Sequence, residues 1–297
     1  QGQRLSLVPA GGAARDRWQL WQGTKVGRDV QQTVHWRIVA GDASSAWRRL
    51  TVRPVPDVTG LRIVCTPPAY TGLDATASLP GRTCDVDTIV GAQVAVDAKA
   101  NVPARDPMLV LTSGGADDET RLPMATDDAD PTRIAGRFMV TQSGHYCLRF
   151  TDAGGEPNRD PIRHVIHARP DKPPVVAVSV PAGDVQVRPG DSLAIRGVAD
   201  DDFGVARLAI AYKRGAEGGV ISLPLPAAAA TSAAGKPTSR PSRRAGVDVV
   251  IPVARFDAQP GDTIEWQLAA WDNREDLQGR PAPQQGLGPL RRIRVEA

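Results

Sequence analysis

A short pattern recurs three times along the chain: an aromatic residue, an aliphatic residue two positions later, and an aspartate six positions after the aromatic. The copies are Trp36-Arg37-Ile38 ending at Asp42, Tyr146-Cys147-Leu148 ending at Asp152, and Trp266-Gln267-Leu268 ending at Asp272. Alternation with a period of two puts the aromatic and the aliphatic side chain on the same face of a β-strand. The pattern therefore predicts three copies of one strand with a buried face.

The copies are about 110 to 120 residues apart, which is the length of an immunoglobulin-like module. We interpret them as the sixth strand (F) of successive modules, each followed by a turn and a last strand (G) at 48–52, 163–168 and 291–295. Two modules also share earlier strands: 61–65 and 175–180 (A), 91–96 and 190–195 (B), and 108–111 and 205–212 (C). No stretch has a convincing helical period. We expect an all-β chain of tandem immunoglobulin-like (fibronectin- or cadherin-like) sandwiches.

Proline clusters mark the boundaries. Pro54-Val55-Pro56 and Pro170-Asp171-Lys172-Pro173-Pro174 each follow a last strand and precede a first strand. Because proline restricts itself and the residue before it to extended geometry, these links should be short and stiff. We expect the C-terminal part of a module at 1–54, a module at 55–170 and a module at 171–297. A segment rich in Ala, Ser, Pro and Arg at about 226–246 is expected to be a disordered insertion.

The first module lacks its opening strands, so we expect residues 1–54 to pack against sequence upstream, against the second module or against a partner chain. The chain begins at Gln1 without methionine or an apolar leader, which is expected of a processed product or an excerpt. No apolar run is long enough to span a bilayer, so any membrane anchor would belong to the full-length protein.

The net charge of +3 is small, and arginines alternate with acids along the whole chain. Nucleic-acid-binding proteins usually carry a basic face or stripe, so we do not expect a nucleic-acid partner. The three cysteines permit a Cys65–Cys84 disulfide or three free thiols, and their spacing matches no zinc motif. The sequence contains no nucleophile elbow, zinc-protease helix, P-loop or dinucleotide fingerprint, and we therefore expect no enzymatic activity and no cofactor other than the calcium considered next.

An acidic cluster is the candidate site. The loop between strands B and C of the last module contains Asp200, Asp201 and Asp202, and the loop after strand F contains Asp272, Asn273 and Asp276. These two loops project from the same end of an immunoglobulin-like sandwich, and calcium binds six to eight oxygens of this kind. The cluster predicts a calcium site. The alternative is that the same aspartates cap tight turns through bonds to the backbone.

Aromatic residues are interpreted mainly as core. Tyr146 follows Ser143-Gly144 at the start of a strand F, where sandwich modules often place a tyrosine whose hydroxyl bonds back to the E–F turn. Trp18 and Trp21 are three positions apart and therefore on opposite faces of a strand. An exposed Trp21 would offer a stacking platform for a sugar, whereas burial against missing strands is the alternative.

Three phrases carry a resemblance: Thr66-Pro67-Pro68-Ala69-Tyr70-Thr71-Gly72-Leu73, Ser143-Gly144-His145-Tyr146, and Asp200-Asp201-Asp202-Phe203-Gly204 with Trp271-Asp272-Asn273. They are similar to the extracytoplasmic region of large membrane-anchored bacterial envelope proteins of unknown function, from about Trp36 onward. The resemblance implies serial immunoglobulin-like modules in the periplasm or outside the cell, without an enzymatic role and without functional residues to carry over.

Three functions follow as hypotheses. The first is a non-catalytic structural or interaction segment of an envelope protein, which spaces or displays other domains and contacts a protein or an envelope polymer. The second is an adhesion module stiffened by calcium at the acidic cluster. The third is an accessory carbohydrate-binding module of an envelope enzyme.

Overall fold

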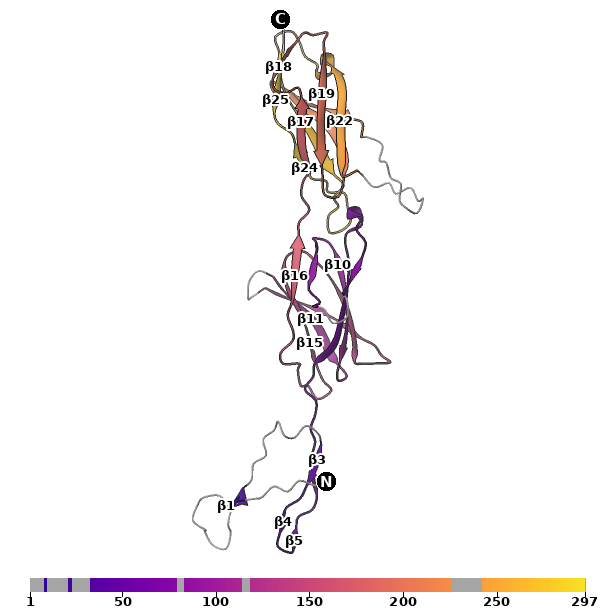
Figure 1. Cartoon of the computed structure of the whole chain (residues 1–297), viewed down its shortest axis with the longest axis vertical. Coiled ribbons are helices and arrows are strands. Elements are labelled where there is room, and N and C mark those ends of the chain that lie inside the picture. Colours follow the sequence, from indigo (N-terminus) through magenta and orange to yellow (C-terminus); the bar gives the residue numbers. More distant parts are fainter. Residues whose placement is uncertain are drawn as a thin grey trace.

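The computed structural model describes residues 8–9, 21–22, 33–78, 83–113, 118–225 and 242–296. Within these ranges the regular elements are β-strands and two short 3-10 turns, η2 (Ala69–Thr71) and η3 (Val253–Phe256). Figure 1 shows the strands gathered into parts that follow one another along the long axis, from the N-terminal segment to the C-terminus. The prediction of an all-β chain built from sandwich modules is confirmed.

The second module consists of two five-stranded sheets. The first sheet has the order β13 (Ala125–Thr126), β14 (Arg133–Met139), β10 (Gln93–Ala100), β7 (Val58–Thr66) and β8 (Thr76–Ala77). The second has the order β12 (Glu119–Pro123), β11 (Arg105–Ser113), β15 (Gly144–Thr151), β16 (His164–Arg169) and β9 (Val86–Ile89). Only β9 and β16 pair in parallel within these two sheets. The chain thus begins in one sheet and crosses to the other, as in immunoglobulin-like sandwiches.

The third module repeats this plan. Its smaller sheet has the order β17 (Val175–Val180), β19 (Ser192–Asp200) and β22 (Arg244–Pro252). Its larger sheet has the order β18 (Val185–Val187), β25 (Arg291–Val295), β23 (Thr263–Asp272), β20 (Val205–Arg214) and β21 (Glu217–Leu223), with β24 (Gln285–Leu287) also paired to β23. The parallel pair of β18 and β25 corresponds to that of β9 and β16.

Burial alternates along the strands as the period-two pattern predicts. Every second residue of β10 is buried, and Tyr146, Leu148 and Phe150 of β15 enter the core of the second module. Trp266 and Leu268 of β23 enter the core of the third. The sandwich interior thus accounts for the aromatic and aliphatic positions of two of the three repeated patterns.

The first module differs. Its described strands form small antiparallel ribbons: β1 (Val8–Pro9) with β2 (Trp21–Gln22), β3 (Val34–Trp36) with β6 (Arg48–Leu50), and β4 (Val39–Ala40) with β5 (Ala43–Ser44). Trp36 and Ile38 are 43% and 46% exposed. The prediction that they lie on a buried face is therefore wrong, because a strand buries one face only where a second layer covers it. The described residues of this segment include no such layer.

The structure bears on three further expectations. The Tyr146 hydroxyl donates a hydrogen bond to the Cys84 carbonyl at 2.5 Å, so the acceptor is the segment before β9 and not the E–F turn. Cys65, Cys84 and Cys147 are buried and unpaired, which settles the open disulfide question for this structure. Most of the predicted insertion lies outside the described residues, but its last three residues, 244–246, are part of β22.

Candidate functional site at the junction of the second and third modules

The register of the third module brings the two acidic loops together. Strand β19 ends at Asp200, and β20 begins at Val205, which lies opposite Asp272 at the end of β23. The B–C loop and the end of strand F therefore meet at the end of the sandwich that faces the second module (Figure 1).

Asp201 and Asp272 each use one carboxylate oxygen to hold the backbone. Asp201 Oδ2 accepts hydrogen bonds from the N–H groups of Phe203 at 2.9 Å and Gly204 at 2.6 Å. Gly204 has φ of 143°, a conformation that favours glycine at this turn. Asp272 Oδ1 accepts from the N–H groups of Arg274 at 3.2 Å and Gln284 at 2.7 Å. Turn capping, the alternative to a calcium site, thus accounts for one of the two oxygens of each carboxylate.

Asp200 and Asp276 belong to other interactions. Asp200 is exposed and lies 3.7 Å from the Arg244 guanidinium. Asp276 accepts hydrogen bonds from the Gln278 and Arg280 N–H groups and from the Arg280 side chain. The Arg280 N–H bond in particular lowers the pKa of Asp276. Both residues therefore have local partners of their own.

Asn273 and Phe203 connect the third module to the second. Asn273 Nδ2 donates to the Tyr70 carbonyl at 2.8 Å, and the Phe203 ring packs edge-to-face on the Tyr70 ring with centroids 6.0 Å apart. Tyr70 lies in η2, which Gly72 ends in a left-handed conformation with φ of 61°. Two of the three phrases that carried the family resemblance are therefore in contact across the junction.

Asp171, in the linker, is the site residue that sequence reasoning missed. Its carbonyl accepts a hydrogen bond from Gln284 Nε2 at 3.2 Å, which holds the linker on the third module. Burial first, and then Asp202 and Asp272, raise the pKa of its carboxyl to about 7, while the nearby Tyr70 hydroxyl opposes the rise. Yet neither Asp171 oxygen completes a hydrogen bond of normal geometry. An aspartate in a proline-rich linker has no periodic signal that would have singled it out.

The carboxyl groups act on one another throughout this junction. Burial raises the pKa of Asp201, and Asp202 and Asp272 raise it further, against the two N–H groups that the side chain accepts. The pKa of the Tyr70 hydroxyl is also raised, by burial and by Asp171. We use the name junction cluster for Asp171, Asp201, Asp202 and Asp272. In the described residues no group of three or more Asp, Glu, His or Cys side chains already has the arrangement of a metal site.

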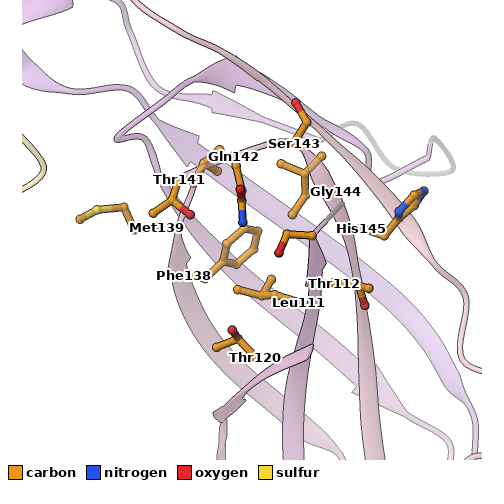
Figure 2. Close-up of a pocket in the computed structure, with 13 residues that line it drawn as sticks. Leu111, Thr112, Thr120, Phe138, Met139, Thr141, Gln142, Ser143, Gly144 and His145 are labelled. Atoms are coloured by element: carbon orange, nitrogen blue, oxygen red, sulfur yellow. The ribbon is translucent and has the colours of Figure 1, made fainter. Parts of the chain in front are cut away.

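Two hollows lie away from the junction. One, of about 70 Å³, lies beside the E–F turn of the second module, where Figure 2 shows Phe138 and Leu111 facing the same space. It is far smaller than the pockets that hold organic ligands. The other, about 1010 Å³ and open, has both positive and negative residues in its lining, and that lining includes neither histidine nor cysteine.

Two other predicted features bear on function. The side chains of Trp18 and Trp21 lie outside the described residues, so the sugar platform stays a prediction. No described helix has the length and apolar character needed to cross a bilayer.

The chain matches no protein-family model and no curated protein sequence. Solved structures with similarity to it include a DUF3823 family protein from Bacteroides uniformis, at 10% identity and a TM-score of 0.27, over 64% of this chain and 89% of that one. Fibronectin(III)-like modules of Clostridium thermocellum CbhA have 14% identity and a TM-score of 0.24, over 74% and 93%. The IG1 and IG2 domains of DIP-gamma have 12% identity and a TM-score of 0.26, over 82% and 99%. These scores are low, and the fold assignment rests on the sheet topology.

Proposed function

We propose that this chain is a non-catalytic spacer and interaction segment of a bacterial cell-envelope protein, located in the periplasm or outside the cell. Its role is geometric: it holds the parts before and after it at a set separation and orientation. Its partners are proteins or an envelope polymer, which would contact exposed strand edges such as β12 and β21.

The observation that carries this proposal is the contact-rich junction between the second and third modules. Links between independent modules usually permit relative motion unless the interface restrains it. Here the Tyr70–Phe203 ring pair contributes about 0.5–1.5 kcal/mol beyond its buried area. The Asn273–Tyr70 hydrogen bond adds about 1 kcal/mol, and Pro174 of the linker is itself buried. These contacts favour one orientation of the two modules.

The envelope location is supported by the phrases around Tyr70, Tyr146 and Asp200–Gly204, which resemble extracytoplasmic regions of envelope proteins. The structure supplies a reason for two of these phrases to occur together, since Tyr70 contacts Phe203 and Asn273. A motif pair that builds a junction between modules fits a spacer role.

Spin labels on the two modules test the proposal directly. Ala135→Cys and Val250→Cys place labels on exposed positions of β14 and β22, while the three native cysteines are buried. Electron-electron distance measurements should give one narrow distribution, and Tyr70→Ala should broaden it. Leu73→Ala, an exposed change close to Tyr70, is the matched control and should leave the distribution narrow. A broad distance distribution in the doubly labelled chain that keeps Tyr70 would refute a fixed spacer.

A further inference from the structure

The junction cluster combines three separate parts of the chain in one place. Asp171 comes from the linker, Asp201 and Asp202 from the B–C loop, and Asp272 from the end of β23. Asp202 and Asp272 both act on the carboxyl of Asp171, and both act on that of Asp201. Carboxyl groups from three segments thus lie close enough to act on one another at the end of the third module.

Several oxygens in this cluster are buried without a hydrogen-bond donor. Asp272 is only 1% exposed, and its Oδ2 has no partner although its Oδ1 has two. Asp201 Oδ1 and Asn273 Oδ1 also have no partner, and the two oxygens of Asp171 have none of normal geometry although the Tyr70 hydroxyl is near. Buried polar atoms in native proteins normally find a partner, so five such oxygens at one junction require an explanation.

A cation explains them better than a hydrogen-bond donor would. All five atoms are oxygens, four of them from carboxylates, and burying ionised carboxylates without a counter-charge is costly. Oxygen-only sets suit hard cations, and they do not suit zinc or copper, which prefer nitrogen and sulfur. Calcium accepts irregular sets of six to eight oxygens, whereas magnesium requires a near-ideal octahedron.

We propose that this junction binds a calcium ion through the carboxylates of Asp171, Asp201, Asp202 and Asp272 and the amide oxygen of Asn273. Water completes the coordination. Asp202 is exposed and already acts on the carboxyl of Asp171, and the carboxylates close around the ion when it binds. The ion ties the linker to the third module beside Tyr70 and so stiffens the junction. This site goes beyond the spacer role and does not depend on it.

Isothermal titration of the whole chain with calcium chloride, after EDTA treatment and desalting, tests the site. We expect binding of a single ion and a rise in the thermal unfolding midpoint with calcium concentration. Magnesium chloride at the same concentrations should bind at least about tenfold more weakly. Absence of calcium heat together with an unchanged midpoint would overturn the proposal, as would equal binding of magnesium.

Two variants locate the ion, and two serve as controls. Asp171→Asn and Asp202→Asn each remove one ligand charge and should weaken calcium binding about tenfold or more. Asp200→Asn changes the neighbouring aspartate that faces Arg244, and Asp152→Asn changes the equivalent of Asp272 in the second module. Both controls should bind calcium as the unsubstituted chain does. Asp202 is exposed, so its variant keeps the fold, as circular dichroism would verify. Unchanged affinity in Asp202→Asn and Asp171→Asn would overturn the assignment.

Discussion

The two junctions of this chain occupy equivalent places but balance their charges in opposite ways. At the first, Arg53 lies close to the loop that contains Asp152 and lowers the pKa of that carboxyl, after the stronger effect of the Glu156 N–H. At the second, the residue in the linker is Asp171, and the charges that act most on it are those of Asp202 and Asp272. The first junction thus has a positively charged side chain, Arg53, beside its aspartate, whereas the second brings several carboxylates together.

The B–C loops of the two modules also differ in charge and in how far their side chains are hydrogen-bonded. In the second module this loop contributes Asn101, whose amide donates to the Val55 carbonyl at 2.8 Å and accepts from the Asp57 N–H at 2.9 Å. A neutral side chain with both ends satisfied holds that linker. In the third module the corresponding loop contributes Asp201 and Asp202, and part of their hydrogen-bonding capacity is unused. The comparison teaches that one fold can hold its neighbour by pairing every polar atom of a side chain at the junction, or can leave several carboxylate oxygens there unpaired.

The largest loss of stability should come from Gly286→Ala, which should push the linker away from the third module at the second junction. A Cβ at Gly286 would overlap the Pro174 carbonyl, so the linker backbone must leave β24. Overpacking of this kind costs about 1–3 kcal/mol, and it should also broaden the distance distribution between the two modules. Thermal unfolding and the spin-label experiment measure the two effects. Gly183→Ala, where no atom lies within 4 Å of the new Cβ, is the control. A Gly286→Ala chain as stable as the control would show that the linker does not pack on β24.

Asp202→Lys should make the second junction resemble the first. A lysine at this exposed position places a positive charge beside Asp171, as Arg53 lies beside Asp152. We expect calcium binding to be lost and the calcium-free chain to gain about 0.5–1 kcal/mol after allowance for solvent screening. Calorimetry and unfolding in EDTA measure both. Asp200→Lys should give no such gain. If Asp202→Lys still binds calcium, a positive side chain at this position does not replace the ion, and the comparison with Arg53 fails.

Strand positions in this molecule follow from local pattern, whereas the junction does not. Tyr146, Trp266 and their aliphatic companions are buried as period two predicts, because an alternating strand in a sandwich has one inward face. The same pattern in Trp36 and Ile38 predicts burial wrongly, since burial also needs a facing sheet. Local sequence specifies which side chains share a face but not what covers that face.

The candidate site was partly visible in the sequence. Asp201, Asp202, Asp272 and Asn273 were found because B–C and F–G loops of a sandwich share one end. Asp200 and Asp276 were included with them because a sequence does not show that Arg244 and Arg280 are their partners. The contribution of the linker could not be read locally, since it depends on how one module enters the next.

The pH dependence of stability should have opposite signs at the two junctions in EDTA. The pKa of Asp171 is about 7 in the folded chain and ordinarily about 4 in an unfolded one. Between these values the folded chain holds a proton that the unfolded chain lacks, so this contribution to stability is full at low pH and is lost as pH rises to about 7. The pKa of Asp152 is lowered, so its contribution is present above about pH 4 and is lost as pH falls through its folded value.

Unfolding midpoints across this pH range separate the two effects. Asp171→Asn should remove the decline between about pH 5 and 7, and Asp152→Asn should remove the loss at the acidic end. Each variant serves as the control for the other. The same decline in Asp171→Asn as in the parent chain would assign it to another carboxyl.

The smallest effect should come from Arg53→Gln at the first junction. Arg53 and Asp152 are accessible to solvent, and pairs of this kind contribute little to stability, so the unfolding midpoint should change by an amount close to the limit of measurement. The pKa of Asp152 should rise, but only partly, because the Glu156 and Gly154 N–H groups still bond to the carboxylate. Carbon-detected NMR titration of the Asp152 carboxyl measures this, with Asp130 of the same module as an internal reference. A large loss of stability would mean that Arg53 clamps the first module to the second, and the two junctions would then be equally stiff without calcium.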